Sequence, residues 1–274
     1  MDLEKQVAAH YTTGVLERKI LDALASAGCD LNRLRPEDLV AVEDFHIGGR
    51  EATQALAEFM NLRTGMHLLD VGCGIGGPAR YFAGRGCKVT GIDLSEEFIA
   101  TAQSLTRRVQ LESALTFRQA SALALPFNAG TFDGAYEIHV GMNISDKLGV
   151  FREIARVLKP GARFAIYDIM QARKDSFAFP VPWAKASGTS FVESLDQYRE
   201  RLNDAGFEVV HERGRRQFAV EVIQKRMADA SASTKPVLGV NLLMGDLAPA
   251  MFKNINTAIA SGVLEPVELV GVKR

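Results

Sequence analysis

The sequence predicts an α/β protein built on a doubly wound, mostly parallel sheet of seven strands. From Met66 onward, short apolar runs alternate with segments of helical periodicity, which is the pattern of βαβ units. A glycine-rich stretch, "DVGCGIGG", directly follows the first apolar run. Glycines at this point are typical of a strand that turns into a helix beside a ligand. We therefore expect a binding site beyond the carboxyl ends of the strands.

The strands and helices of this sheet can be placed in order along the chain. The expected strands are 66–71, 87–93, 114–120, 131–138, 163–169, 207–214 and 266–274. The expected helices between them are 74–85, 95–109, 146–158 and 194–206. Pro78 is tolerated in the first turn of a helix because N–H groups there have no intrahelical acceptor. Ser95 is expected to cap the second helix and Gly206 to end the last.

Helical additions flank this core at both ends. Residues 3–26 carry apolar side chains at three-to-four spacing, and 214–262 are expected to be largely helical. The sequence thus predicts an N-terminal helical lid (1–60), a ligand-binding core (61–212) and a C-terminal helical insertion with the final strand (213–274).

Composition excludes several classes of partner. The 274 residues include 32 Lys plus Arg and 33 Asp plus Glu, so no overall field attracts nucleic acid or an anionic membrane. No apolar run reaches about 18 residues and no signal-peptide core is present, so a cytoplasmic location is expected. Cys29, Cys73 and Cys87 lack CxxC spacing and no two histidines are four residues apart, which predicts neither a disulfide framework nor a metal site. A small molecule is the expected partner.

Two ligands are compatible with the glycine loop itself. Gly72, Gly74 and Gly77 form the GxGxxG pattern of dinucleotide sites, and Asp93 follows Gly74 by about 20 residues, where an acid can bind ribose hydroxyls. Asp70 discriminates between them, because a carboxylate two residues before the first glycine would repel a pyrophosphate. It would instead attract a cationic ligand such as S-adenosylmethionine, which has a sulfonium, an ammonium and no phosphate.

Several motifs together resemble one enzyme family. "LLDVGCGIGG", "VTGIDLS", "ALALPF", "FDGAYEIHVGMN" and "RVLKPGARFAIYDI" resemble the class I S-adenosylmethionine-dependent methyltransferases over roughly residues 45–212. "FHIGGREAT", "MNISDK" and "FPVPWA" are similar to the small-molecule branch that contains sarcosine/dimethylglycine N-methyltransferases. The resemblance implies a Rossmann-like sheet with an antiparallel last strand, S-adenosyl-L-methionine as cofactor, S-adenosyl-L-homocysteine as product and no metal. A homodimer is compatible with this family.

The resemblance also implies which residues hold the cofactor. Gly72, Gly74 and Gly76 would let the backbone approach it, Asp70 would organise its amino-acid end, and Asp93 would bind its ribose. The remaining cofactor candidates are Leu94 and Phe98 on the adenine, Ser121, Ala122 and Leu123 at its edge, His46 and Ile47 at the methionine carboxylate, and Glu137, facing either the ammonium or solvent. Ser121 departs from the family, since many members have an acid there.

The candidates for catalysis and acceptor binding come from three segments. His139, just past the fourth strand, is a candidate base or orienting group, and Tyr11 resembles a tyrosine that relatives fold over the methyl group. Met142, Asn143 and Trp183 would contact the acceptor together with His139. The resemblance favours methylation of an amine nitrogen. The alternatives are methylation of oxygen or carbon on a small metabolite, an NAD(P)-binding oxidoreductase, and a non-catalytic cofactor-binding protein.

Overall fold

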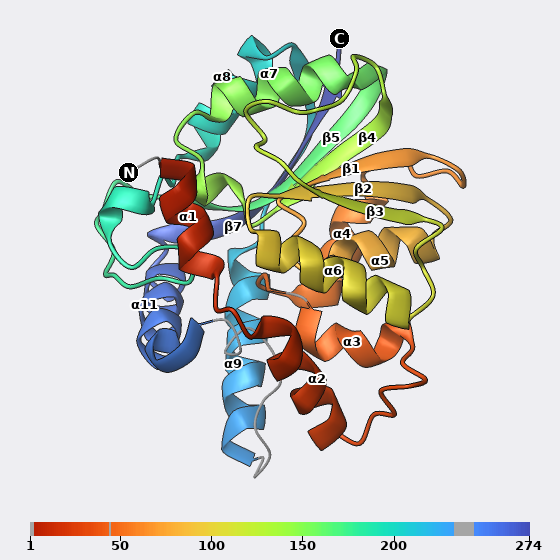
Figure 1. The fold of residues 1–274 in the computed structure, drawn as a ribbon. Helices are drawn as coiled ribbons and strands as arrows, with labels where there is room; N and C mark the ends of the chain where they lie inside the picture. The colour runs from red at the N-terminus through yellow and green to blue at the C-terminus, as the bar shows by residue number, and fades with distance from the viewer. Residues whose placement is uncertain (1–2, 44, 233–243) are drawn as a thin grey trace.

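A sheet of seven strands forms the centre of the protein in the computed structural model, which describes residues 3–43, 45–232 and 244–274 (Figure 1). The strands are β1 His67–Val71, β2 Lys88–Asp93, β3 Leu115–Gln119, β4 Phe132–Ile138, β5 Leu158–Gln171, β6 Phe207–Gly214 and β7 Leu264–Lys273. Their order is β3-β2-β1-β4-β5-β7-β6, and β7 pairs antiparallel with both β5 and β6. The predicted mostly parallel sheet with an antiparallel last strand is confirmed.

Helices cover both faces of the sheet. One face carries α4 (Gly49–Glu58), α5 (Gly77–Gly84) and α6 (Glu96–Arg108), and the other carries α7 (Lys147–Val157) and α8 (Leu195–Asp204). Successive residues of a strand point to opposite faces. Leu68 of β1 accordingly packs with the α4 and α5 side chains, whereas its neighbour Leu69 packs with those of α7 and α8.

The helix boundaries follow from local chemistry. Ser95 caps α6 as predicted, because its side chain accepts a hydrogen bond from the Phe98 N–H at 3.3 Å. The helix expected from Gly74 begins instead at Gly77. Gly74 and Gly76 have φ angles of 52° and 86°, left-handed values that a helix cannot contain, so the loop is longer than predicted.

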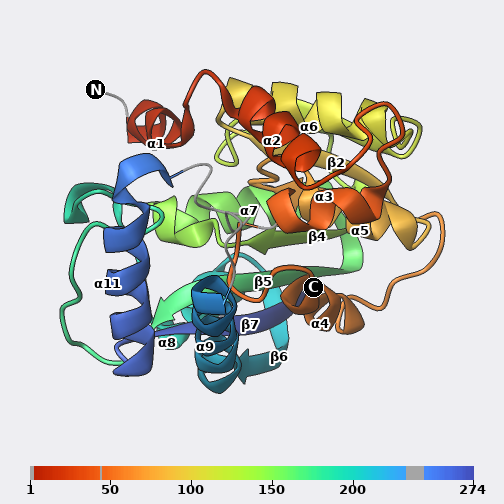
Figure 2. The same cartoon turned by 90° about the horizontal axis from the view of Figure 1, so that it is seen from below.

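The two helical additions lie on opposite sides of the strand ends (Figure 2). The N-terminal part forms α1 (Leu3–Tyr11), α2 (Leu16–Ser26) and α3 (Pro36–Glu43), with a break at Gly14, whose φ is 73°. The C-terminal part forms α9 (Arg216–Ala232), η3 (Gly245–Leu247) and α11 (Ala248–Ala260). Of the segment predicted as largely helical, 233–243 lie outside the described residues. Two further short helices are η1 (Gly141–Asn143) and η2 (Ser187–Thr189).

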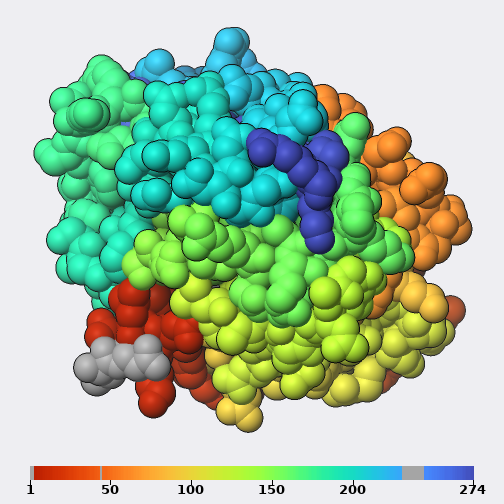
Figure 3. All heavy atoms as spheres, turned by 90° about the horizontal axis from the view of Figure 1, so that it is seen from above, coloured from red at the N-terminus to blue at the C-terminus, as the bar shows by residue number. Residues whose placement is uncertain are grey.

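The last strand of the chain is an inner strand of the sheet. β7 lies between β5 and β6, so the part of the chain after residue 213 contributes an inner strand as well as helices. Figure 3 shows its end (blue) at the surface between the green and teal parts of the chain. Within the described ranges, no helix is both long and apolar enough to cross a membrane.

Candidate functional site

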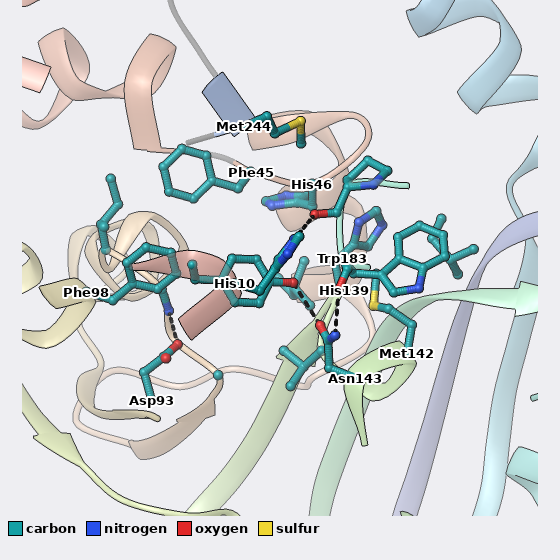
Figure 4. Close-up of a pocket in the computed structure, with 18 of the residues that line it drawn as sticks. His10, Phe45, His46, Asp93, Phe98, His139, Met142, Asn143, Trp183 and Met244 are labelled. Carbon is teal, nitrogen blue, oxygen red and sulfur yellow. Dashed lines mark hydrogen bonds between the residues drawn. The ribbon is translucent and has the colours of Figure 1, made fainter. Parts of the chain in front are cut away.

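A cavity of about 1240 Å³ lies at the carboxyl ends of β1, β2 and β4, between the N-terminal helices and the pair α9 and α11. It collects most of the residues predicted from sequence: Tyr11, His46, Ile47, Asp70, Gly72, Gly74, Asp93, Leu94, Phe98, Ala122, Leu123, His139, Met142, Asn143 and Trp183. Gly76, Ser121 and Glu137 are not part of its wall. In Figure 4, Asp93 and Phe98 lie at one end of the pocket, and His139, Met142 and Trp183 at the other.

The glycine loop forms the floor at the Asp93 end. Gly72 has a φ of 69°, and a Cβ at this position would lie 2.5 Å from a methyl carbon of Val140, so only glycine fits. The Gly74 N–H donates to Asp93 Oδ2 at 3.0 Å, and the Ser95 N–H donates to Oδ1 at 2.9 Å. Asp93 therefore joins the loop to the start of α6. Gly76 serves packing, since a Cβ there would meet the Phe117 ring at 2.8 Å.

Asp70 presents to this pocket a carboxyl group with one oxygen that has no hydrogen-bond partner. Its side chain is buried at the end of β1, and Oδ2 has no hydrogen-bond partner. Burial raises the pKa of Asp70 to about 8; the neighbouring Tyr136 hydroxyl opposes the shift, and the negative charge of Asp93 adds to it. A buried acid without a partner is unfavourable. A cationic group of a bound ligand would supply that partner, so the residues present fit an ammonium at this point.

Aromatic rings enclose the space above Asp93. The Phe98 ring lies 5.6 Å from the Tyr11 ring and is stacked at 6.4 Å on Phe45, measured between centroids. Leu94 and Leu123 also line this part of the cavity. Phe45 was not among the predicted residues. Phe45 directly precedes "HIGG", a segment already predicted to contact the cofactor, and this position could have identified it as a site residue.

Helix α1 closes over the pocket through polar contacts with two loops. The Tyr11 hydroxyl donates to Asn143 Oδ1 at 2.8 Å, and Asn143 Nδ2 donates to the Trp183 carbonyl at 2.9 Å. Nε2 of His10 donates to the Pro182 carbonyl at 3.0 Å. Both ends of the Asn143 amide are thus engaged within the protein, so it positions the lid against the 182–183 loop.

Ser121 reaches the same lid from outside the cavity. Its hydroxyl donates to a carboxylate oxygen of Glu4 in α1, while Ala122 and Leu123 next to it line the pocket. The contact predicted between Ser121 and an adenine stays a prediction, and the structure adds a role in holding α1.

His139 lines the pocket in a constrained backbone conformation. Its φ is 55°, and its ring lies 5.2 Å from the Tyr167 ring and 5.9 Å from the His46 ring. Burial, reinforced by His46, holds the pKa of His139 well below the usual 6.5, so the imidazole is neutral at pH 7. Nε2 is buried without a hydrogen-bond partner among the described residues.

His46 beside it is also neutral. Burial lowers the pKa of His46 to about 4, and its Nε2 lies 2.9 Å from the Gly49 carbonyl. Because a carbonyl can only accept, Nε2 carries the proton and the tautomer is defined. The two neighbouring histidines therefore bring no positive charge to this part of the pocket.

Glu137 is placed differently from both positions expected for it. It is fully buried on the sheet face covered by α7 and α8, and neither carboxylate oxygen has a partner. Burial and the charge of Asp168 raise the pKa of Glu137 well above its usual value, while Lys147 opposes the shift. Asp168 itself accepts a hydrogen bond from the Tyr198 hydroxyl at 2.7 Å. Glu137 thus belongs to a buried polar cluster beneath the site.

The end of the pocket opposite Asp93 is apolar. We call this part the apolar lobe; its wall consists of Ile47, Met142, Ile169, Trp183, Ile223 and Ile255. The Trp183 ring is held by a hydrogen bond from Nε1 to Ser190 Oγ at 2.9 Å. Ile223 and Ile255 come from α9 and α11 and were not predicted as site residues. Within the described part of the chain, no three His, Cys, Asp or Glu side chains are grouped to hold a metal ion.

Comparison with known proteins agrees with this geometry. Residues 69–166 match the family described as "Methyltransferase domain". O-methyltransferase resE of Aspergillus sclerotiorum is 32% identical over 180 residues, which cover 64% of this chain and 67% of that protein. Methyltransferase phqN of Penicillium fellutanum is 38% identical over 120 residues, 43% of this chain and 37% of its own length. The chain thus spans little more than a third of the latter relative.

A solved structure shows that the fold is shared over the whole chain. The geranyl diphosphate C-methyltransferase from Streptomyces coelicolor A3(2), crystallised with Mg2+, geranyl diphosphate and S-adenosyl-L-homocysteine, superposes with a TM-score of 0.73. The superposition covers 100% of this chain and 98% of that one at 16% identity. The family match and the relatives in sequence favour a methyl donor over a dinucleotide for the glycine loop. The chain belongs to the class I S-adenosylmethionine-dependent methyltransferases.

Proposed function

We propose that this protein transfers the methyl group of S-adenosylmethionine to an uncharged nucleophile of a small-molecule acceptor, with His139 receiving the acceptor's proton. The observation that carries the proposal is buried Asp70, whose Oδ2 has no hydrogen-bond partner and which faces the same cavity as the glycine loop and the apolar lobe. One cavity can therefore hold a cationic donor at one end and an acceptor at the other.

The residues at the Asp93 end would bind the donor. Asp93 would accept hydrogen bonds from the ribose hydroxyls, the backbone at Gly72 and Gly74 would allow close approach, and Asp70 would pair with the ammonium. Phe98 and Leu94 would pack on the adenine. When bound, S-adenosylmethionine supplies a methyl carbon activated by a sulfonium, and in-line attack on that carbon leaves the neutral thioether S-adenosylhomocysteine.

This assignment predicts how donor affinity depends on pH. The pKa of Asp70 is raised to about 8 in the free protein, so below that pH the carboxyl is protonated and cannot pair with an ammonium. The donor's affinity should fall as pH decreases from 7.5 to 6.0, by up to about tenfold per pH unit if one proton is displaced. Isothermal titration calorimetry in buffers of different ionisation enthalpy would measure both the affinity and the proton release.

The matched variant is Asp70→Asn. It should bind S-adenosylmethionine more weakly than the parent at pH 7.5 and show no change between pH 6.0 and 7.5. A parent protein whose affinity is independent of pH over this range would contradict the pairing of Asp70 with the ammonium.

The other end of the pocket supports an uncharged acceptor. An O–H or N–H nucleophile must lose its proton during attack, and the neutral imidazole of His139 can receive it on a ring nitrogen. Within the described ranges, the acids that line the pocket are Glu4, Glu43, Glu51, Asp70 and Asp93. All five come from α1, α3, α4, β1 and β2, and none from the segments that build the apolar lobe. This distribution favours a hydroxyl oxygen as nucleophile over a protonated amine.

The amine nitrogen predicted from sequence is the second candidate. It rests on the resemblance of "MNISDK" and "FPVPWA" to amine N-methyltransferases, and both segments border the pocket, through Met142 and Trp183. An amine would have to reach His139 as the free base. Methylation of carbon remains the third alternative.

A screen of metabolite extracts with a methyl-labelled donor would test the proposal. Label on an oxygen atom of a small molecule, lost in a variant without His139, is the expected result. Label on nitrogen would establish the second candidate. A protein that binds S-adenosylmethionine but produces no S-adenosylhomocysteine with any extract would contradict methyl transfer.

The lid contact offers a further prediction. Tyr11→Phe removes the hydrogen bond to Asn143 that joins α1 to the loop carrying Trp183. We expect the donor to dissociate about fivefold faster, corresponding to the ~1 kcal/mol of one hydrogen bond, with little change in melting temperature. Stopped-flow fluorescence would measure the rate. Thr12→Ala is the control, because the Thr12 hydroxyl bonds only within the lid, to the Ala8 carbonyl.

A further inference from the structure

We infer that the acceptor has an extended hydrocarbon body which fills the apolar lobe, carries its reacting hydroxyl at the end next to His139, and bears no positive charge. This inference rests on the proposed function and adds the chemical class of the acceptor.

The size of the cavity supports a second, sizeable ligand. Ligand sites typically enclose about 300–1000 Å³. The cavity here is about 1240 Å³ and extends from Asp93 past His139 to the pair α9 and α11. The residues that fit the donor lie at the Asp93 end, so the space at the other end belongs to the acceptor.

The wall of the apolar lobe is built from separate segments that all contribute apolar side chains. Met142 comes from η1, Ile169 from β5, Trp183 from the loop that precedes η2, Ile223 from α9 and Ile255 from α11. These five side chains belong, together with Ile47, to one apolar cluster. A strongly polar acceptor would leave its groups without hydrogen-bond partners against this wall, which is costly.

Methionine side chains add a second feature. Met142 and Met251 both line the cavity and are almost fully buried. A thioether chain is flexible and polarisable, so it packs against apolar bodies of different shape. The lobe is therefore suited to a hydrocarbon body.

The charges around the lobe disfavour a cation. Among the residues that the structure describes, the segments that build it contribute two basic residues to the cavity wall, Lys185 from the loop and Arg226 from α9, and no acidic residue. Their positive potential disfavours an ammonium and tolerates a neutral or anionic group. His139 lies where the lobe meets the donor end, so the reacting hydroxyl must be at that end of the hydrocarbon.

A series of straight-chain primary alcohols from butanol to decanol tests the inference. Their binding to the protein saturated with S-adenosylhomocysteine would be measured by calorimetry. Each added methylene should strengthen binding by about three- to fourfold until the lobe is full. An alkylammonium of the same length should bind at least about tenfold more weakly than the alcohol.

Variants in the lobe separate this effect from binding elsewhere on the protein. Ile223→Trp should shorten the chain length at which affinity stops rising, and Ile223→Ala should weaken binding of the longest alcohol while leaving butanol unchanged. Val210→Trp is the control, because Val210 is exposed on β6 outside the cavity. Unchanged affinity for S-adenosylhomocysteine shows that each variant is folded.

The outcomes distinguish the two proposals. Affinity that does not depend on chain length, in a protein that binds S-adenosylhomocysteine, would overturn the inference alone. Equal effects of Ile223→Trp and Val210→Trp would also overturn it. A protein that binds neither S-adenosylmethionine nor S-adenosylhomocysteine would overturn the proposed function and the inference with it.

Discussion

Replacing Asp93 by alanine is expected to weaken S-adenosylmethionine binding by about a hundredfold. Asp93 accepts hydrogen bonds from the N–H groups of Gly74 and Ser95 and would accept those of the ribose hydroxyls. Hydrogen bonds to a charged group contribute about 1.5–3 kcal/mol each, so losing the ribose contacts alone corresponds to this factor or more. The loosened glycine loop adds to the loss. Calorimetric titration with S-adenosylmethionine would measure it.

Two further variants test whether the loss of affinity comes from the Asp93 carboxylate. Asp93→Asn retains one acceptor oxygen and the shape of the side chain, so its affinity should lie between those of the parent and Asp93→Ala. Asp175→Asn is the matched control, because Asp175 is exposed and pairs only locally, with Arg173. If Asp93→Ala binds the donor as tightly as Asp175→Asn, the donor site has been placed wrongly.

Replacing His139 by asparagine is expected to reduce kcat by about a hundred- to ten-thousandfold, the usual contribution of a general base. The affinity for S-adenosylmethionine should stay within about twofold. Asparagine is the suitable substitute because His139 has a φ of 55°, and asparagine tolerates left-handed backbone better than most residues. The variant therefore removes the imidazole without straining the loop. Single-turnover measurements with saturating donor would isolate the methyl-transfer step.

The pH profile adds an independent readout. The pKa of His139 lies well below 6.5, so the neutral base is present above that pH and is lost only on further acidification. With saturating donor, the parent's kcat should remain constant as pH falls through 6.5, whereas an ordinary histidine would already be half protonated. A kcat that halves near pH 6.5 would contradict the role assigned to buried His139.

His211→Gln is the control for this variant. The His211 ring stacks on Phe59 with centroids 3.5 Å apart and does not line the cavity. Its replacement should leave kcat unchanged. Equal losses in the two histidine variants would indicate a general effect on the fold.

Much of the core could be predicted because its signals are local. The alternation of apolar runs with helical segments predicted all seven strands, and Ser95 was placed as a helix cap from its side chain and position alone. The spacing of Asp93 from the glycines likewise depends only on one βαβ unit, whose geometry is nearly constant. The structure therefore brings Asp70, Gly74 and Asp93 together as the sequence suggested.

Glu137 shows where local signals fail. The sequence pattern of a strand predicts that neighbouring residues face opposite sides of the sheet, but it does not predict which side faces the ligand. In the structure Tyr136 packs with the α4 and α5 side chains, and Glu137 next to it is buried among α7 and α8. Only the packed sheet could decide this.

The sequence by itself determined the sheet, the glycine loop and the acids that fit the donor, because each is encoded within one strand, turn or helix end. The tertiary structure alone decided the acceptor end. Tyr11 meets Asn143 across 132 residues of sequence, and Ile223 and Ile255 join Met142 and Trp183 in one wall. Such contacts depend on how α1, α9 and α11 pack against the strand ends, and the helical period of each segment does not specify its neighbour.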